Sequence, residues 1–334
     1  MICKRISGTR QHGFSLVEIM VAMVLGIVML LVVSEVFVNN SRTRDEVEKS
    51  GRQIENGTYA LRLLEDELAN AGYWGEAGGQ PVAASLPPLC PTAAADISAA
   101  MGYPIQGDAG SGSNCAKSKD GSAFLAIRRV STCAVGDVGC AAASTDFHLQ
   151  VSACQSESPG TLKLSTNVDA LVFKQHDCKA TAPRYRFLSR VFYVGDNDIL
   201  MRAELSSGNY NTVTSLVDDI EIIRFEYGLD INGDAQVDEY TPAPDDTDWP
   251  NVVAVKVSLI ARNPQATLGY VDERTYMVAG EEYEVPDDRL AFRRQFYSTT
   301  VHLRNVAGRR ELPAVTTANE ESEGTESTEE VPSP

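Results

Sequence analysis

Hydrophobic and polar positions divide the first 72 residues into two stretches of one helix. Residues 14–38 are almost wholly apolar, and 25 helical residues rising about 1.5 Å each would extend roughly 37 Å, enough to cross a bilayer core. Residues 39–72 continue the helix as an amphipathic stretch with charged residues between the members of one apolar stripe. That stripe comprises Val47, Ile54, Leu61, Leu64, Leu68 and Ala71. The pattern predicts one helix from Phe14 to about Ala71.

Strand patterns dominate from about residue 122 onward. Five segments are rich in β-branched and aromatic residues: "SAFLAIRRV", "RYRFLSRVFYV", "DIEIIRFEYG", "VVAVKVSLIAR" and "QFYSTTVHLRN". In the fourth, Val255 and Val257 share one face while Lys256 and Ser258 share the other, which indicates a sheet with one packed face. Residues 73 to about 120, rich in Gly, Ala, Pro and Ser, predict a loop. The fold class is therefore α+β, with the helix packed on an antiparallel sheet in a head of residues 73–310.

Composition excludes several classes of function. With 46 acidic and 29 basic residues the chain carries a charge of −17, which disfavours nucleic-acid binding. The sequence has no GxSxG, Walker A or HExxH motif, and its histidines are isolated, so we expect neither an enzyme nor a required cofactor. Residues 311–334 contain seven glutamates and no basic or aromatic residue, which predicts a disordered acidic tail.

Six of the seven cysteines lie within 89 residues of one another, without a CxxC pair or a histidine cluster. This arrangement favours three disulfides formed in an oxidising compartment. We expect pairing between neighbours, with Cys133 and Cys140 the best pair because "CAVGDVGC" contains two turn-forming glycines; the other pairings, and free buried thiols, remain alternatives. The six are Cys90, Cys115, Cys133, Cys140, Cys154 and Cys178.

The first 13 residues have the character of a leader. Lys4, Arg5 and Arg10 give them a charge of +3, which keeps this end on the cytoplasmic side of a membrane. No Ala-x-Ala cleavage site follows the apolar stretch, so the span is expected to stay in the mature protein. Any processing must precede the span, and Gly13 is the residue small enough to mark the cut.

The stretch "GFSLVEIMVAMVLG" resembles the amino-terminal junction of the type IV pilin and pseudopilin superfamily. Four further segments, "LEDELANAGYWG", "EYGLDINGDAQVDEY", "WPNVVAVKVSLIARN" and "RRQFYSTTVHLRN", resemble minor pilins of the PilW type. The resemblance implies that a prepilin peptidase cuts between Gly13 and Phe14 and methylates the new amino terminus. It also implies that Glu18 serves subunit assembly.

Physical chemistry agrees with that role for Glu18. A carboxylate inside lipid costs at least ~2.5 kcal/mol, so it persists there chiefly when a partner compensates it. The amine of Phe14 would be mostly charged at neutral pH, and it lies about 6 Å from Glu18 along the helix. The amine of a neighbouring subunit could therefore meet Glu18 when two helices are staggered by about four residues. Alternatively, Glu18 reaches the headgroup region, as we expect of Glu35 at the other end of the span.

The resemblance implies a minor pilin that helps to initiate a type IV pilus, in a priming or tip complex. Its implied partners are other minor pilins, the major pilin, the prepilin peptidase, the inner-membrane assembly platform and a tip adhesin. The precursor would span the inner membrane of a Gram-negative bacterium once, with a periplasmic head. Two alternatives stay open: a J-like minor pseudopilin of a type II secretion system, and a membrane-anchored calcium-binding or adhesive protein that never polymerises.

The segment "DINGDAQVDEY" admits two interpretations. Its oxygen-bearing side chains fall at alternate positions, as in a calcium-binding loop: Asp230, Asn232, Asp234, Gln236 and Asp238. However, Ala235 and Thr241 stand where an EF-hand has Gly and Glu. The other interpretation, which we favour, is an acidic hairpin turn between two strands.

Overall fold

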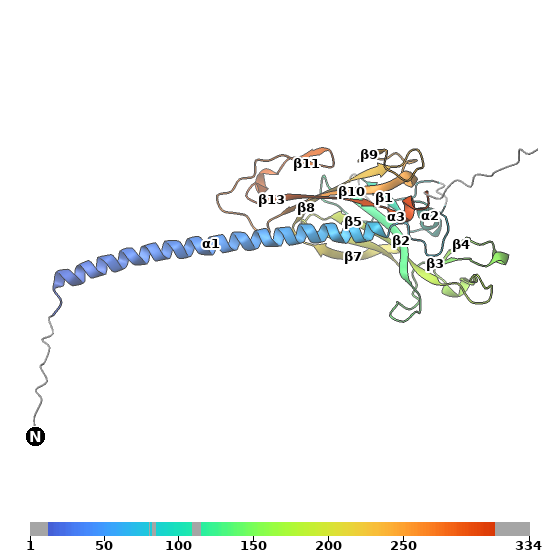
Figure 1. The fold of residues 1–334 in the computed structure, drawn as a ribbon, viewed down its shortest axis with the longest axis horizontal. Coiled ribbons are helices and arrows are strands. Elements are labelled where there is room, and N and C mark those ends of the chain that lie inside the picture. The colour runs from blue at the N-terminus through green and yellow to red at the C-terminus, as the bar shows by residue number, and fades with distance from the viewer. Residues whose placement is uncertain (1–12, 80, 82–84, 109–114, 311–334) are drawn as a thin grey trace, which may run out of the picture.

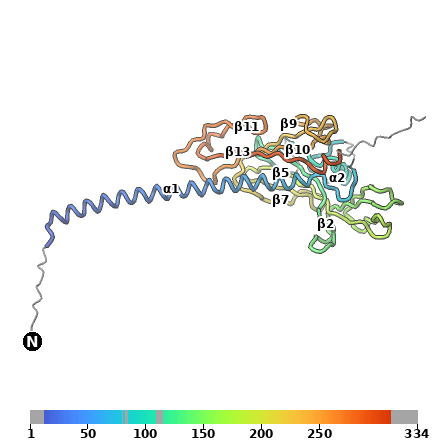
Figure 2. Tube along the Cα trace, viewed as in Figure 1, coloured from blue at the N-terminus to red at the C-terminus, as the bar shows by residue number. Residues whose placement is uncertain are grey.

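The computed structural model describes residues 13–79, 81, 85–108 and 115–310. Most of the predicted leader and the whole acidic tail lie outside these residues. One helix, α1 (Leu16–Ala69), runs from the amino terminus into the head, as Figures 1 and 2 show. The helix ends at Asn70, and Gly72 then adopts a left-handed conformation with φ of 70° that turns the chain into the head. The prediction of a single long helix is confirmed.

The head is built from two antiparallel sheets, a two-stranded hairpin and two short helices. The helices are α2 (Ala94–Ala100) and α3 (Arg304–Ala307). The strands are β1 (Ile105–Asp108), β2 (Phe124–Ala134), β3 (His148–Val151), β4 (Leu162–Ser165), β5 (Arg184–Val194), β6 (Leu200–Ser206), β7 (Asn209–Val217), β8 (Ile220–Leu229), β9 (Glu239–Thr241), β10 (Val252–Arg262), β11 (Tyr276–Val278), β12 (Glu281–Tyr283) and β13 (Arg294–His302). All five predicted strand segments form strands: β2, β5, β8, β10 and β13.

The first sheet has seven strands and is organised around β5. Its main order is β1-β2-β5-β3-β4. The β6–β7 ribbon pairs with the carboxy-terminal half of β5, from Arg190 to Val194. The second sheet has the order β13-β10-β8-β9, with β13 paired along its whole length to β10. The second half of α1 packs against β13 and β10, so helix and sheets share one apolar core.

The other face of the first sheet is covered by the segment after α1. This segment, predicted to be loop, contains α2 and β1. Ile97 of α2 and Met101, which follows the helix, pack with Trp74, Phe124 and Phe187 in a second apolar cluster. The loop prediction was wrong here. The local sequence of this Gly- and Ala-rich segment has little preference for helix or strand, and burial against the sheet gives it an ordered structure.

Three disulfides join the cysteines in neighbouring pairs, as expected. The bonds are Cys90–Cys115, Cys133–Cys140 and Cys154–Cys178. Cys90–Cys115 closes the segment that covers the second apolar cluster. Cys133–Cys140 closes an exposed turn at the end of β2. The disulfides thus stabilise the connections of the first sheet.

The buried stripe of α1 differs from the predicted one. Leu64 and Leu68 are fully buried, but Val47 and Ile54 are 67% and 57% exposed. At about 100° per residue, Val47 and Ile54 lie roughly 80–100° around the helix from Leu64. The three-residue step from Leu61 to Leu64 accounts for about 60° of this angle, and each step of seven residues adds a drift of about 20°. The buried positions are instead Gln53, Gly57, Ala60, Leu64 and Leu68.

The second sheet is also packed on both faces rather than one. Val255, Val257 and Leu259 face the core under α1, as predicted. On the opposite face Ile222 and Ile260 pack against Tyr276 and Val278 of the β11–β12 hairpin. This hairpin belongs to the 31-residue connection between β10 and β13, which the sequence pattern did not assign to any layer.

Candidate functional site: the exposed half of α1

The head holds α1 only from Glu46 onward. The Thr267 hydroxyl donates to the Glu46 carboxylate at 2.8 Å, and Lys49 Nζ donates to the Ala266 carbonyl at 3.4 Å. Deeper in the head, the buried Gln53 amide donates to the carbonyls of Ala261 at 2.8 Å and Arg293 at 3.0 Å. These contacts fix the helix against the ends of β10 and β13 that lie nearest its free half.

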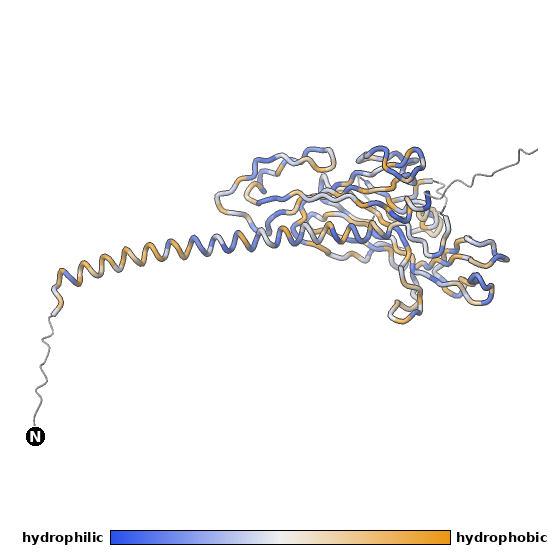
Figure 3. The backbone as a smooth tube through the Cα atoms, in the orientation of Figure 1, coloured by the Kyte–Doolittle hydropathy of each residue, from blue (hydrophilic) through white to orange (hydrophobic). Residues whose placement is uncertain are grey.

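Every residue from 13 to 45 is exposed. The free part of α1 is apolar over most of its length, as the predominance of orange in Figure 3 shows. α1 is long and apolar enough to cross a membrane. An apolar surface of this size is stable only in lipid or against other helices.

The predicted cleavage junction precedes the helix. Ser15 is extended, with φ of −67° and ψ of 145°, and its carbonyl accepts the first helical hydrogen bond from Ile19 at 3.2 Å. Phe14 is 77% exposed. A peptidase needs an accessible peptide outside a regular helix, and residues 13–15 are exposed and precede the helix. Cleavage between Gly13 and Phe14 stays a prediction.

Glu18 lies in the first turn of α1, where the positive end of the helix dipole favours an acidic residue. Its side chain borders a shallow hollow with Phe14, Ile19, Ala22 and Met23. Within the described residues no basic side chain forms an ion pair with Glu18. The carboxylate is exposed on the free half of α1, and its role in assembly stays a prediction.

An uncharged stripe extends along α1 from the apolar half into the half held by the head. Its members are spaced three or four residues apart: Val33, Val36, Asn40, Thr43, Val47, Gly51, Ile54, Thr58 and Leu61. We call this set the 33–61 stripe. Val47, Gly51 and Ile54 are exposed, and a methyl group added at Gly51 would meet no atom within 4 Å. This spacing is typical of a helix that packs along another helix.

Two family models match the chain. The N-terminal methylation motif of prokaryotes matches residues 8–34, and the type IV pilus-assembly protein W model matches residues 191–305, from within β5 to α3. The chain is a type IV pilin of the PilW type. In this pilin the described part of the motif, residues 13–34, lies on the exposed end of α1, and the second match covers the end of β5, the β6–β7 ribbon and the whole second sheet. Interaction with other pilins follows from membership of this family.

One solved structure is similar to this pilin at low identity. It is a type IV-like pilin from Thermus thermophilus, with 12% identity, 76% of this chain and 97% of that chain covered, and a TM-score of 0.39. The comparison with curated proteins gives no match.

The acidic segment forms a hairpin between β8 and β9, in which Tyr227 pairs with Thr241 and Leu229 with Glu239. The side chain of Asp230 turns inward: it accepts from the backbone amides of Gly233 at 2.6 Å and Ala235 at 3.0 Å, and pairs with Arg310 at 2.9 Å. Burial alone would raise the pKa of Asp230, but these partners hold it below its usual value.

The remaining oxygen-bearing side chains of this loop serve similar turns. Asp238 accepts from the Ile231 amide at 2.7 Å, and Asp234 accepts from the Gln236 amide at 2.8 Å. Among the described residues, no group of three or more His, Cys, Asp or Glu side chains is arranged to hold a metal ion. The geometry supports the hairpin interpretation, and calcium binding stays a prediction to be tested.

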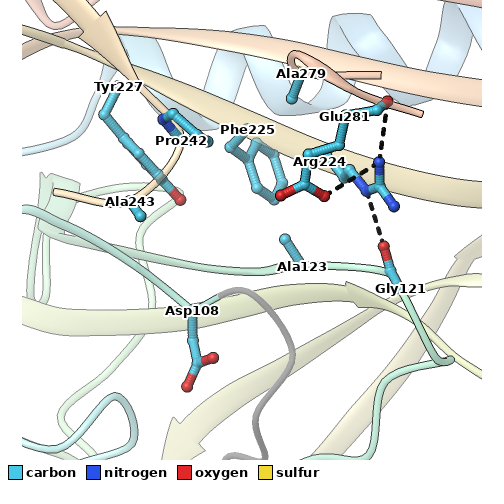
Figure 4. A pocket seen from close by; sticks show the side chains of 10 residues that line it. All are labelled: Asp108, Gly121, Ala123, Arg224, Phe225, Tyr227, Pro242, Ala243, Ala279 and Glu281. Carbon is cyan, nitrogen blue, oxygen red and sulfur yellow. Dashed lines mark hydrogen bonds and ion pairs between the residues drawn. The ribbon is translucent and has the colours of Figure 1, made fainter. Parts of the chain in front are cut away.

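A cavity of about 160 Å³ lies between the two sheets, as Figure 4 shows. Phe225, Tyr227 and Pro242 form its apolar wall. Arg224 closes one side, donating to the Gly121 carbonyl at 3.0 Å and pairing with Glu281 at 3.3 Å. Burial, with the nearby Asp108 carboxylate, raises the pKa of the Tyr227 hydroxyl far above its usual value. These side chains serve to hold the β11–β12 hairpin and the first sheet together.

Sequence reasoning proposed Gly13, Phe14 and Glu18 as site residues, which stays a prediction, and it did not single out the 33–61 stripe. The spacing of that stripe was visible in the sequence, although Val47 and Ile54 were assigned to the buried face. Gln53 and Arg310 carried no local pattern at all. Their partners, the Ala261 carbonyl and the Asp230 carboxylate, are far away in the sequence.

Proposed function

We propose that this pilin is a minor subunit that helps to initiate a type IV pilus and is incorporated in a priming or tip complex. The observation that carries the proposal is the junction itself: a fully exposed apolar helix with a carboxylate at the fifth position after Gly13. Such a helix can lie in a bilayer before assembly and pack among other pilin helices afterwards.

The role of Glu18 in this proposal is electrostatic. Once residues 1–13 are removed, the amine of Phe14 on an adjoining pilin is the nearest strong donor that a staggered helix can offer. The pair fixes the register between the two helices, and the 33–61 stripe continues the contact beyond the membrane. Processing would take place at the inner membrane of a Gram-negative bacterium by a prepilin peptidase, with the head in the periplasm. The major pilin, other minor pilins, the assembly platform and a tip adhesin are the proposed partners.

The test compares two carboxylates of the same helix. Glu18→Ala and Glu35→Ala are expressed in place of the natural chain, and the amino terminus, surface filaments and copurifying pilins are measured. We expect both variants to begin at a methylated Phe14, whereas only Glu18→Ala loses filaments and copurifying pilins. An unprocessed natural chain, or a Glu18→Ala variant that assembles normally, would contradict the proposal.

The same strains separate the pilus from a secretion system. Deleting the gene should reduce surface filaments and leave enzyme secretion intact. Lost secretion with normal piliation would assign the chain to the pseudopilins of a type II system instead.

A further inference from the structure

The connection between β10 and β13 begins with nine uncharged residues, "NPQATLGYV", at positions 263–271. Thr267 is buried, but Gln265, Ala266, Leu268, Gly269 and Val271 are exposed. Leu268 is 91% exposed and Val271 is 57% exposed. We call residues 264–271 the basal loop. In Figure 1 the connection that contains it forms the end of the head nearest the free half of α1.

The conformation of the basal loop fixes where Leu268 lies. The amide of Tyr270 donates to the Thr267 carbonyl at 3.2 Å, which makes a tight turn with Leu268 and Gly269 at its centre. Gly269 has a φ of 76°, the left-handed value that the third position of a type II turn requires. The amide of Thr267 is in turn bonded to the Ala291 carbonyl at 2.8 Å. The apolar tip is thus held outward by backbone hydrogen bonds.

The position of the basal loop along α1 is also fixed. Thr267 and Ala266 are bonded to Glu46 and Lys49, as described above. Glu46 follows the end of the predicted span, Val38, by eight residues, or about 12 Å of helix. The headgroup layer extends roughly 5–7 Å beyond the hydrocarbon core, and spanning helices commonly tilt by about 20°. For a span that ends at Val38, the contact between Thr267 and Glu46 would therefore lie roughly 5–7 Å beyond the headgroup layer, a gap that the exposed tip of a tilted head can cross.

Charge near the basal loop differs from that of the whole chain. The chain carries −17, yet residues 39–53 of α1 contain four basic residues (Arg42, Arg44, Lys49 and Arg52) and three acidic ones (Asp45, Glu46 and Glu48). Arg293 is stacked on the Tyr270 ring at 4.5 Å and also lies at this end. Residues 272–274, which follow the basal loop, carry −1, so these segments together with Arg293 sum to +1. A nearly neutral end with the exposed Arg42 and Arg44 can approach anionic headgroups without the repulsion that the rest of the head would meet.

We propose that the basal loop is a membrane-surface contact: before assembly, Leu268 and Val271 enter the outer headgroup layer and hold the head at a defined tilt above the bilayer. Side chains of this kind lie at the headgroup boundary when a neighbouring element anchors them there. The proposal rests on the proposed membrane span of α1. It requires no other pilin, so it applies to the precursor alone.

Tryptophan fluorescence in proteoliposomes tests this contact. The full chain is reconstituted in phosphatidylethanolamine and phosphatidylglycerol vesicles, with or without bromine near the top of the acyl chains. Leu268→Trp and Val271→Trp are compared with Val138→Trp, which is fully exposed on the turn closed by Cys133 and Cys140. That turn lies beyond β2, whose Arg129 contacts Glu67, about 31 Å along α1 from Glu46. The natural Trp74 and Trp249 are buried and give a constant background.

We expect brominated lipid to reduce the added emission of Leu268→Trp about twofold or more, because a side chain in the headgroup layer lies next to the brominated upper ends of the acyl chains. Val271→Trp should follow it, and Val138→Trp should be unchanged. If the chain stays in the vesicles but quenching is small and equal at positions 268, 271 and 138, the membrane-surface contact is overturned and the membrane span is not. Release of the chain by alkaline carbonate would overturn the membrane span on which both this contact and the proposed function rest.

Discussion

Gly57 of α1 lies directly against the ring of Tyr297 on β13. A methyl group on Gly57 would be 2.7 Å from both Cδ2 and Cζ of that ring, closer than real side-chain contacts allow. The ring in turn donates its hydroxyl to the Gln53 carbonyl at 3.4 Å. The absence of a side chain at Gly57 therefore lets the helix approach the second sheet closely enough for Leu64 and Leu68 to be buried.

Gly57→Ala is expected to destabilise the pilin by about 1–3 kcal/mol, the usual cost of overpacking a close contact. Gly51→Ala is the matched control. It introduces the same methyl group in the same helix, where nothing lies within 4 Å, and should stabilise by up to ~1 kcal/mol because alanine is the better helix former. Urea unfolding of the full chain in detergent measures both values. Equal changes would show that Tyr297 does not limit the helix position.

The elements predicted from the sequence were those with strong local patterns. The long helix and strands such as β10 were visible because period and residue type agree over ten residues or more. β1, with the sequence "IQGD", has no such pattern and is a strand because it pairs with β2. The buried face of α1 was assigned incorrectly because Val47 and Ile54 are apolar, whereas the positions that contact the sheet include Gln53 and Gly57. Only tertiary structure reveals that a glutamine bonds two strand-end carbonyls.

Removing two of the disulfides should have unequal effects. Cys90–Cys115 has a sequence separation of 25 and closes the cover of the second apolar cluster, whereas Cys133–Cys140 has a separation of 7. Replacing both cysteines with serine should cost about 3.5 kcal/mol for the first bond and about 2.4 kcal/mol for the second, by the loop-closure model. Only the first replacement should also increase binding of an apolar dye, because it loosens a buried cluster. Indistinguishable dye binding by the two variants would contradict this assignment.

Acid should destabilise the head through Asp198. Burial alone would raise the pKa of this carboxyl, but hydrogen bonds from Lys119, Arg289 and Arg262 outweigh it and lower the pKa below its usual 3.8. A group whose folded pKa lies below the unfolded value stabilises above the unfolded pKa, and this contribution is lost as pH falls through the folded pKa. The midpoint temperature of thermal unfolding, Tm, should therefore be nearly constant above about pH 5 and should fall below about pH 4.

Asp198→Asn isolates this contribution. The substitution leaves three cations around an uncharged side chain, and breaking a buried pair of this kind costs about 3–5 kcal/mol at neutral pH. The variant should also lose less stability between pH 5 and pH 3 than the natural chain does. A parallel pH profile, merely shifted downward, would show that other carboxylates, such as Asp272, control the acid response.

Calcium should leave the thermal stability of the head unchanged. Asp230, the first residue of the apparent calcium loop, already has both carboxylate oxygens engaged by backbone amides and Arg310. A cation would have to displace that arginine, and the resulting loss of an ion pair offsets the gain in coordination. Differential scanning of the full chain with millimolar calcium or with chelator gives the measurement. A rise in Tm with calcium that disappears in Asp234→Ala would establish the calcium interpretation instead.

The 33–61 stripe should matter for assembly and not for folding. Ile54→Lys places a charge at a position that is 57% exposed, so the free energy of unfolding should change by no more than about 0.5 kcal/mol. If another pilin helix packs along this stripe, the buried charge should reduce copurification of partner pilins about tenfold or more. Tyr59→Lys is the control: it is 55% exposed on the same helix but lies about 140° around the axis from Ile54. Because the two variants add the same charge at nearly the same height, loss of assembly in Ile54→Lys alone would locate the partner helix on the stripe. Equal loss in both would mean that the added charge disturbs the helix regardless of face, and the stripe would then have no special role.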